Sequence, residues 1–155
     1  MADKLTASRR SWNMSRIRAT DTKPEIAVRR YLHRKGLRYR LHPSDLPGKP
    51  DLVFVKLRAC VFVHGCFWHG CTMCIDGTRE VKSNQKYWSP KVAANKERDA
   101  KHETQLQQLD WTVLSIWACE VANEERLEAL FRALKGPSSA KVPGILEPDK
   151  RACAH

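Results

Sequence analysis

The chain contains no long apolar run, and no stretch approaches the ~18 consecutive apolar residues of a transmembrane helix. Residues 1–5 also lack the apolar segment of a signal peptide, so we expect a cytoplasmic protein that does not bind membrane. Cysteines in that compartment stay reduced. The six cysteines are therefore expected to be reduced thiols, and those that cluster in the sequence are expected to bind metal rather than to form disulfides.

Acidic residues are scarce beside basic ones. The chain has 17 Asp and Glu against 28 Lys and Arg, which gives a net charge of +11, and its isoelectric point is about 9.7. This excess favours a polyanionic partner, and nucleic acid is the expected one because no apolar helix points to a membrane. A solvated basic surface without a partner is the alternative.

No internal repeat or low-complexity tract divides the chain, and 155 residues suffice for one domain with a hydrophobic core. We expect a basic DNA-binding arm over residues 1–20, one domain over residues 21–136 and a flexible tail over residues 137–155. The arm carries Trp12 and Met14 among its cations. It can bury little apolar surface alone, so we expect it to become ordered on a partner.

Apolar periodicity predicts an α/β fold. A capping box at Thr22 and Glu25 begins a helix that Gly36 ends, and two later helices are expected over residues 88–109 and 123–134. Strands are expected over residues 37–41, 51–55, 60–64 and 111–117. Strands between flanking helices favour a three-layer sandwich around a mixed β-sheet.

Four cysteines are spaced as a metal site. Cys66, Cys71 and Cys74 lie within one short segment, and Cys119 ends a later strand, so together they offer the four thiolates of a closed structural zinc site. The same spacing is that of a plant-type [2Fe–2S] ferredoxin, and buried free thiols need no metal. A fifth cysteine, Cys60, lies in an apolar strand and is expected in the core.

A catalytic metal site is also indicated. The predicted hairpin returns Asp51 to the end of the strand that carries His64, and a carboxylate beside backbone carbonyls suits Mg²⁺. His64 and His69 can transfer protons near neutral pH, although either could instead bind zinc. Metal, acid and base together are what phosphodiester hydrolysis needs. By spacing alone, Asp51 and Glu25 are equally typical of turn or cap residues, and Asp99 of an exposed helical charge.

Large apolar side chains lie among cations or metal ligands at three places in the chain. They are Met14 in the basic arm, Phe67 and Trp68 in the cysteine segment, and Trp88 at the start of a predicted helix. Such side chains suit stacking on bases or wedging between them, and burial in the core is the alternative.

Taken together, these motifs resemble the very short patch repair (Vsr) endonucleases. The matching segments are 13–19, Glu25, 46–51, 63–69, 95–99 and 111–119, and they cover roughly residues 8–135. The resemblance implies a restriction-endonuclease-like fold and a Mg²⁺-dependent nick in duplex DNA, 5′ of the thymine in a T:G mismatch left by deamination of 5-methylcytosine. It also implies a bacterial, nucleoid-associated monomer with repair proteins as possible partners.

The resemblance assigns a role to each site residue. Asp51 and the backbone carbonyl of Val63 bind Mg²⁺, and His69 activates water. Supporting acidic and imidazole groups are His64, Asp99 and Glu25. The zinc ligands are Cys66, Cys71, Cys74 and Cys119. The side chains that open or contact the duplex are Met14, Phe67, Trp68, Trp88, Arg16 and Arg18.

Two positions depart from the family pattern. Val63 stands where the family has threonine, although a backbone carbonyl is still available there. Cys71 stands where the best-known member has histidine, and sulfur in place of nitrogen keeps a tetrahedral ligand set. A zinc-containing DNA-binding module without catalysis is the alternative function, and an iron–sulfur redox protein is a third.

Overall fold

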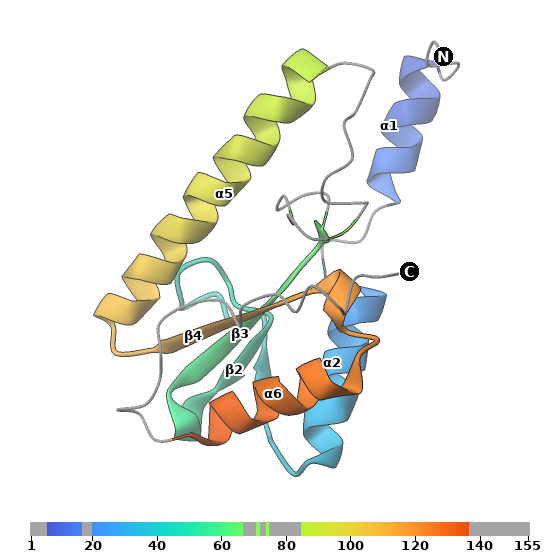
Figure 1. Ribbon diagram of the computed structural model, residues 1–155. Helices are drawn as coiled ribbons and strands as arrows, with labels where there is room; N and C mark the ends of the chain where they lie inside the picture. Colours follow the sequence, from blue (N-terminus) through green and yellow to red (C-terminus); the bar gives the residue numbers. More distant parts are fainter. Residues whose placement is uncertain (1–5, 17–19, 67–70, 72–73, 75–84, 137–155) are drawn as a thin grey trace.

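The computed structural model describes residues 6–16, 20–66, 71, 74 and 85–136. In chain order the elements are α1 (Ala7–Ser15), α2 (Lys23–Arg34), β1 (Arg40–Leu41), β2 (Leu52–Phe54), the 3₁₀ turn η1 (Val55–Leu57), β3 (Ala59–His64), α5 (Gln85–Gln108), β4 (Thr112–Trp117), the 3₁₀ turn η2 (Ala118–Glu120) and α6 (Glu124–Lys135) (Figure 1). The predicted tail lies outside these residues.

The four strands form one mixed sheet in the order β1-β2-β3-β4. The first three strands pair antiparallel, whereas β3 and β4 pair parallel over their whole length, from Ala59 opposite Thr112 to His64 opposite Trp117. A parallel pair needs a long crossover, and α5 lies within it. The predicted α/β class and mixed sheet are confirmed.

Helix α2 begins as the sequence predicts. The Thr22 hydroxyl accepts a hydrogen bond from the Glu25 N–H at 3.4 Å and donates one to the Glu25 carboxylate at 3.1 Å. Pro24 fits the first turn of the helix. A backbone N–H at that position would have no acceptor within the helix, so proline loses no hydrogen bond there. Gly36 follows the helix with a φ of +89°, a conformation that glycine adopts without strain.

Strand β1 is shorter than the predicted strand over residues 37–41. It contains only Arg40 and Leu41, because residues 37–39 do not pair with β2. Its end at Leu41 agrees with the prediction, since His42 next in the chain has a φ of +44° and ends the extended backbone. Pro43 follows, and it has no N–H to continue the ladder. The bend at His42 starts a loop that crosses one end of the sheet.

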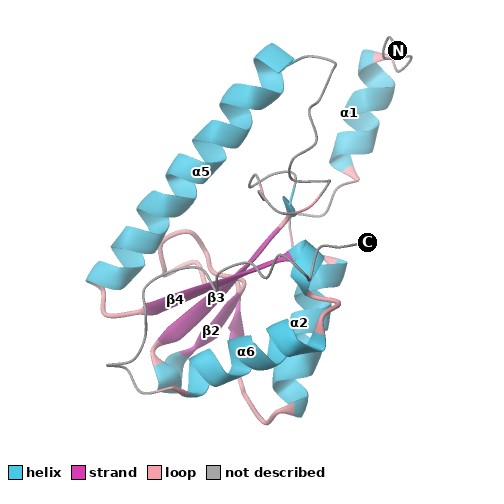
Figure 2. Cartoon of the chain, viewed as in Figure 1, coloured by secondary structure: helices cyan, strands magenta, loops and turns pink. Residues whose placement is uncertain are grey.

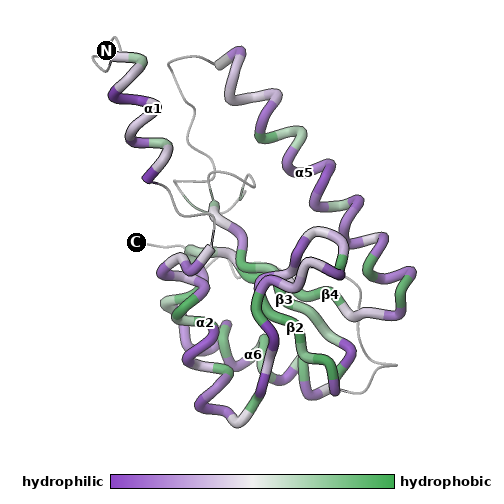
Figure 3. The backbone as a smooth tube through the Cα atoms, turned by 180° about the vertical axis from the view of Figure 1, so that it is seen from behind, coloured by the Kyte–Doolittle hydropathy of each residue, from purple (hydrophilic) through white to green (hydrophobic). Residues whose placement is uncertain are grey.

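Two apolar layers cover the two faces of the sheet. On one face, α2 and α6 pack against alternate strand residues such as Phe54, Val61 and Ile116. On the other face, Leu106 of α5 packs with the fully buried Cys60. Figure 3 shows the hydrophobic strands running between the more hydrophilic helices. The core position predicted for Cys60 is confirmed.

Helix α1 differs from the expectation that residues 1–20 gain order only on a partner. The Thr6 hydroxyl caps it by accepting from the Arg9 N–H at 3.2 Å, and the exposed Trp12 ring lies beneath the guanidinium groups of Arg9 and Arg16, 5.3 and 4.8 Å away. The helix has no buried residue. Figure 2 shows α1 and the first half of α5 extending beyond the same end of the sheet. In the described part of the chain, no helix combines the length and apolar character needed to cross a bilayer.

The packing of α5 on the sheet can be tested by paired truncations. Leu106 is fully buried, whereas Leu109, the first residue after α5, is 49% exposed. Leu106→Ala is expected to lower the free energy of unfolding by about 2–5 kcal/mol, because it removes buried methyl groups and leaves a cavity. Leu109→Ala should change it by less than about 1 kcal/mol. Urea denaturation measures both, and equal losses would contradict this placement of α5.

Candidate functional site

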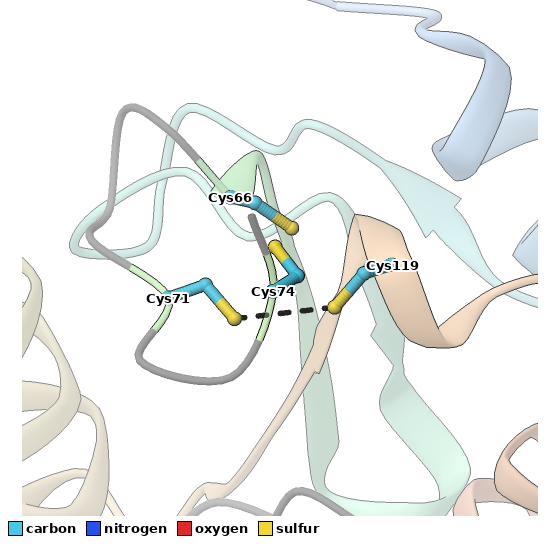
Figure 4. A group of neighbouring side chains, drawn as sticks. All are labelled: Cys66, Cys71, Cys74 and Cys119. Atoms are coloured by element: carbon cyan, nitrogen blue, oxygen red, sulfur yellow. Dashed lines mark hydrogen bonds between the residues drawn. The ribbon is translucent and has the colours of Figure 1, made fainter. Parts of the chain in front are cut away.

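The parallel pairing of β3 with β4 brings two distant cysteines together. His64 lies opposite Trp117, and Cys66 and Cys119 each follow two residues later. Cys71 and Cys74 complete a group whose four sulfur atoms lie within 4.8 Å of one another, with Cys71 and Cys119 Sγ 3.9 Å apart. Figure 4 shows the four thiols turned toward a common centre.

The donor set of this group fits a soft or borderline metal ion. None of the five cysteines in the described residues forms a disulfide. Burial raises the pKa of the Cys66 thiol to about 12, so in the absence of a cation this group stays protonated. A bound metal ion reverses that preference, because it stabilises the thiolate form. Four converging sulfur atoms match the ligand number of a closed tetrahedral site.

Glu120 fixes the turn that carries Cys119. Its side chain is fully buried, and its Oε2 accepts a hydrogen bond from the Trp117 N–H at 3.0 Å. Its Oε1 lies 2.8 Å from Nη2 of Arg126 in α6. This arrangement ties η2 both to the end of β4 and to the neighbouring helix, so the backbone of Cys119 has little freedom.

The hairpin places Asp51 where the sequence predicts, beside residues 63–65. Asp51 Oδ2 accepts a hydrogen bond from the Val63 N–H at 2.7 Å. Burial raises the pKa of Asp51 from an ordinary 3.8 to about 6; the Val63 N–H opposes this shift and the negative charge of Glu25 adds to it. A buried carboxylate with a raised pKa is typical of functional sites.

Asp51 opens into a cavity of about 870 Å³ that brings together six of the predicted site residues. Of the predicted residues, those lining it are Met14, Glu25, Asp51, Val63, His64 and Asp99. The basic side chains of Lys49, Lys91 and Arg98 line the same cavity. Carboxylates, an imidazole and cations thus share one hollow at the end of the sheet, a combination suited to a metal ion and a phosphate group.

The ring of His64 is held between two aromatic side chains. It stacks parallel on Phe62, with ring centroids 5.9 Å apart and an interplanar angle of 4°, and it contacts Trp117 at 5.2 Å. Both neighbours belong to the sheet, so the imidazole projects from a rigid strand end. A ring held in this way can present a nitrogen to the cavity in a constant direction.

The family model described as "DNA mismatch endonuclease Vsr" matches residues 2–74. The protein named type II nicking enzyme V.XorIIP from Xanthomonas oryzae is 46% identical over 89% of this chain and 100% of its own length. The DNA mismatch endonuclease Vsr of Escherichia coli is 37% identical over 87% of this chain and 86% of its own length. This chain belongs to the Vsr family. A further relative, V.NmeAIP from Neisseria meningitidis, is 42% identical over 87% of this chain and 98% of its own length.

Other residues that the Vsr resemblance assigns lie away from the cavity or outside the described chain. The residues outside the described ranges are Phe67, Trp68, His69 and Arg18. Arg16 stacks on Trp12 in α1. The Trp88 ring packs edge-on against the ring of Tyr87. Lys91, one turn later in α5, places its Nζ 5.6 Å from the centre of the Trp88 ring.

Glu25 fulfils its predicted cap role and also faces the site. It is 3% exposed, and its Oε2 accepts from the Asp21 N–H at 2.9 Å and from Arg29 Nη2 at 3.1 Å. Oε2 also lies 3.5 Å from His42 Nε2. The cap interpretation and the active-site interpretation are therefore compatible, because a single carboxylate serves the helix start and the cavity wall.

Sequence reasoning missed two histidines of the cavity wall. His42 begins a loop rich in proline and glycine, and His102 follows Asp99 by one turn of α5. Gly48 of the loop lies against His102, and a Cβ at Gly48 would lie 2.8 Å from the His102 Cβ. The only sequence signal for His42 is its position before a proline, which by itself indicates a loop and not a site.

The raised pKa of Asp51 predicts a stability cost at neutral pH. The folded state holds this proton more tightly than the unfolded chain, so ionised Asp51 lowers the free energy of unfolding as pH rises from about 4 to about 6, and the loss persists above that range. Asp51→Asn keeps an acceptor for the Val63 N–H and removes the charge. It should raise the free energy of unfolding at pH 7 by about 1–3 kcal/mol.

The measurement is urea denaturation at pH 5 and pH 7 without added divalent ion. The gain should shrink at the lower pH, where Asp51 is largely protonated. Asp45→Asn is the matched control, because Asp45 is 65% exposed and contacts Arg40 only at 3.8 Å. A gain that is equal for both variants would contradict the burial cost assigned to Asp51.

Proposed function

We propose that this protein is a mismatch endonuclease that nicks one strand of duplex DNA on the 5′ side of the thymine in a T:G mismatch. The observation that carries the proposal is the Asp51 carboxylate, held by the Val63 N–H and facing a cavity that also contains His64 and Asp99. Membership of a family whose Escherichia coli member is named a DNA mismatch endonuclease supports the same activity.

Asp51 and the backbone carbonyl of Val63 would hold Mg²⁺. The ion would neutralise charge on the scissile phosphate and lower the pKa of a bound water. His69 accepts the proton of the attacking water, and Asp99 orients the His69 ring. His64 stays in a fixed direction between Phe62 and Trp117, so it can contact the phosphate or donate a proton to the leaving oxygen.

The duplex would lie along the open side of the cavity. Lys49, Lys91 and Arg98 supply positive charge there, and the projecting α1 and α5 extend the surface past the end of the sheet. Met14 also lines the cavity and can wedge into the stack together with Phe67, Trp68 and Trp88. A T:G pair is read partly through the ease with which the duplex deforms.

A zinc ion bound by the four cysteines would be structural. It would tie the segment after β3 to η2 and so fix the segment that carries Phe67, Trp68 and His69. The chain would comprise a DNA-binding arm over residues 1–20 and an endonuclease domain over residues 21–136. The domain would have a restriction-endonuclease-like sandwich fold. The protein would act as a monomer in the bacterial cytoplasm, on nucleoid DNA, with other repair proteins acting after the nick.

A nicking assay on a labelled duplex with one T:G mismatch tests this function. With Mg²⁺, the protein should cut the thymine strand 5′ of the mismatch and leave the matched duplex intact. Asp51→Asn should slow the reaction by at least ~10²-fold, since a buried neutral amide binds Mg²⁺ poorly. Asp45→Asn should cut normally. Mismatch binding without strand scission at any Mg²⁺ concentration would contradict the proposal and indicate a binding module.

Metal analysis tests the structural zinc. The purified protein should contain about one zinc ion per chain and show no visible absorption band. Cys119→Ser should lose most of the zinc and unfold at a lower temperature, because a structural metal contributes folding free energy. Cys60→Ala changes a buried cysteine outside the group and should retain the zinc. Full zinc content in Cys119→Ser, or a coloured iron-containing protein, would contradict the site.

A further inference from the structure

We propose that His42 is a positioning residue that directs the Asp51 carboxylate toward the divalent ion. His42 is held by Arg29 in the tautomer that carries its proton on Nδ1, the nitrogen that faces Asp51. This inference rests on the proposed function, because it concerns the metal-binding carboxylate of that same cavity. It adds a residue to which neither the sequence motifs nor the relatives assign a role.

His42 lies between two carboxylates of the cavity, the buried one of Glu25 and the largely buried one of Asp51. Its Nδ1 is 3.6 Å from Asp51 Oδ1, and its Nε2 is 3.5 Å from Glu25 Oε2. Asp51 Oδ2 is already occupied by the Val63 N–H at 2.7 Å. Val63 and His42 thus face different oxygens of the same carboxylate, and we infer that together they limit its rotation.

Arg29 decides which nitrogen of His42 carries the proton. Arg29 Nη2 lies 3.1 Å from His42 Nε2, and a guanidinium can only donate. Nε2 must therefore be the acceptor, which leaves the proton of the neutral ring on Nδ1, opposite Asp51. Arg29 is itself fixed, because Nη1 donates to Asp21 at 2.7 Å and Nη2 to Glu25 at 3.1 Å.

The contacts of Arg29 argue against a metal ion in this cluster. Asp21, Glu25 and His42 place ligand atoms within 4.8 Å of one another, as a metal site would. The Arg29 guanidinium contacts all three at 2.7 to 3.1 Å and supplies their positive charge. We therefore infer that Asp21, Glu25 and Arg29 hold His42 in place. The divalent ion would bind at Asp51, on the Nδ1 side of the ring.

The backbone at His42 adopts an uncommon conformation that the surrounding loop maintains. Its φ of +44° lies in the left-handed region, where residues other than glycine are uncommon and histidine, asparagine and aspartate are enriched. Pro43 directly after it is buried, and the loop is fixed against α5 where Gly48 meets His102. The turn of the backbone at His42 thus places the imidazole in the wall of the cavity.

Three substitutions at His42 distinguish the role of Nδ1 from the role of Nε2. His42→Asn places an amide N–H near the position of Nδ1 and suits the left-handed backbone. His42→Gln places an amide near the position of Nε2 but offers no donor to Asp51. His42→Leu removes both. The probe is Mn²⁺ alone, and its binding is measured by electron paramagnetic resonance without DNA and therefore without turnover.

If His42 positions Asp51 through Nδ1, His42→Leu and His42→Gln should both weaken Mn²⁺ binding by ~10-fold or more, the usual effect of losing a group that orients a metal ligand. His42→Asn should stay within ~3-fold of the unaltered protein. Equal Mn²⁺ affinity in all three variants would overturn the proposal, as would retention by His42→Gln with loss in His42→Asn.

The tautomer gives a second test that needs no variant. Two-dimensional ¹H–¹⁵N spectra of the histidine rings at neutral pH should show His42 protonated on Nδ1 only. A proton on Nε2, or on both nitrogens, would overturn the assignment. The nicking assay on the unaltered protein keeps the two hypotheses distinct: loss of nicking there would contradict the proposed function, whereas normal nicking with a proton on Nε2 would contradict only the role of His42.

Discussion

The parallel register between β3 and β4 is the constraint on which the rest of the site depends. It sets His64 opposite Trp117 and, two residues further, brings Cys66 close to Cys119 although 52 positions separate them in the chain. The long crossover through α5 makes this pairing possible and places Lys91, Arg98 and Asp99 on the rim of the same cavity. A shift of one residue would turn His64 to the opposite face and separate the sulfur atoms.

The cavity combines groups that cost stability with groups that offset the cost. Asp51 and Glu25 are two carboxylates in largely buried positions, and the negative charge of Glu25 disfavours ionisation of Asp51. The Val63 N–H, the Arg29 guanidinium and the His42 ring each face one of these carboxylates. The folded chain therefore holds a concentrated negative charge ready for a cation, and it places that charge at the end of a rigid sheet rather than on a free loop.

Much of this arrangement could be predicted from local patterns. The capping box at Thr22 and Glu25, the hairpin that returns Asp51 to Val63 and the spacing of the four cysteines all depend on short-range rules, and the structure agrees with each. Helix α1 was not anticipated, because it buries no residue and its apolar positions give no inward face. His42 was also missed, since its role depends on Arg29, 13 positions earlier in the chain, and on a backbone bend that no pattern of residue types reveals.

The most direct test of the account is a crystal structure soaked with Mn²⁺, with anomalous diffraction recorded at the zinc and manganese absorption edges. We expect a zinc peak at the centre of Cys66, Cys71, Cys74 and Cys119, and a manganese peak beside the carboxylate of Asp51, with Arg29 still bonded to His42. A manganese peak among Asp21, Glu25 and His42 with the guanidinium displaced, or no zinc among the four sulfur atoms, would contradict it.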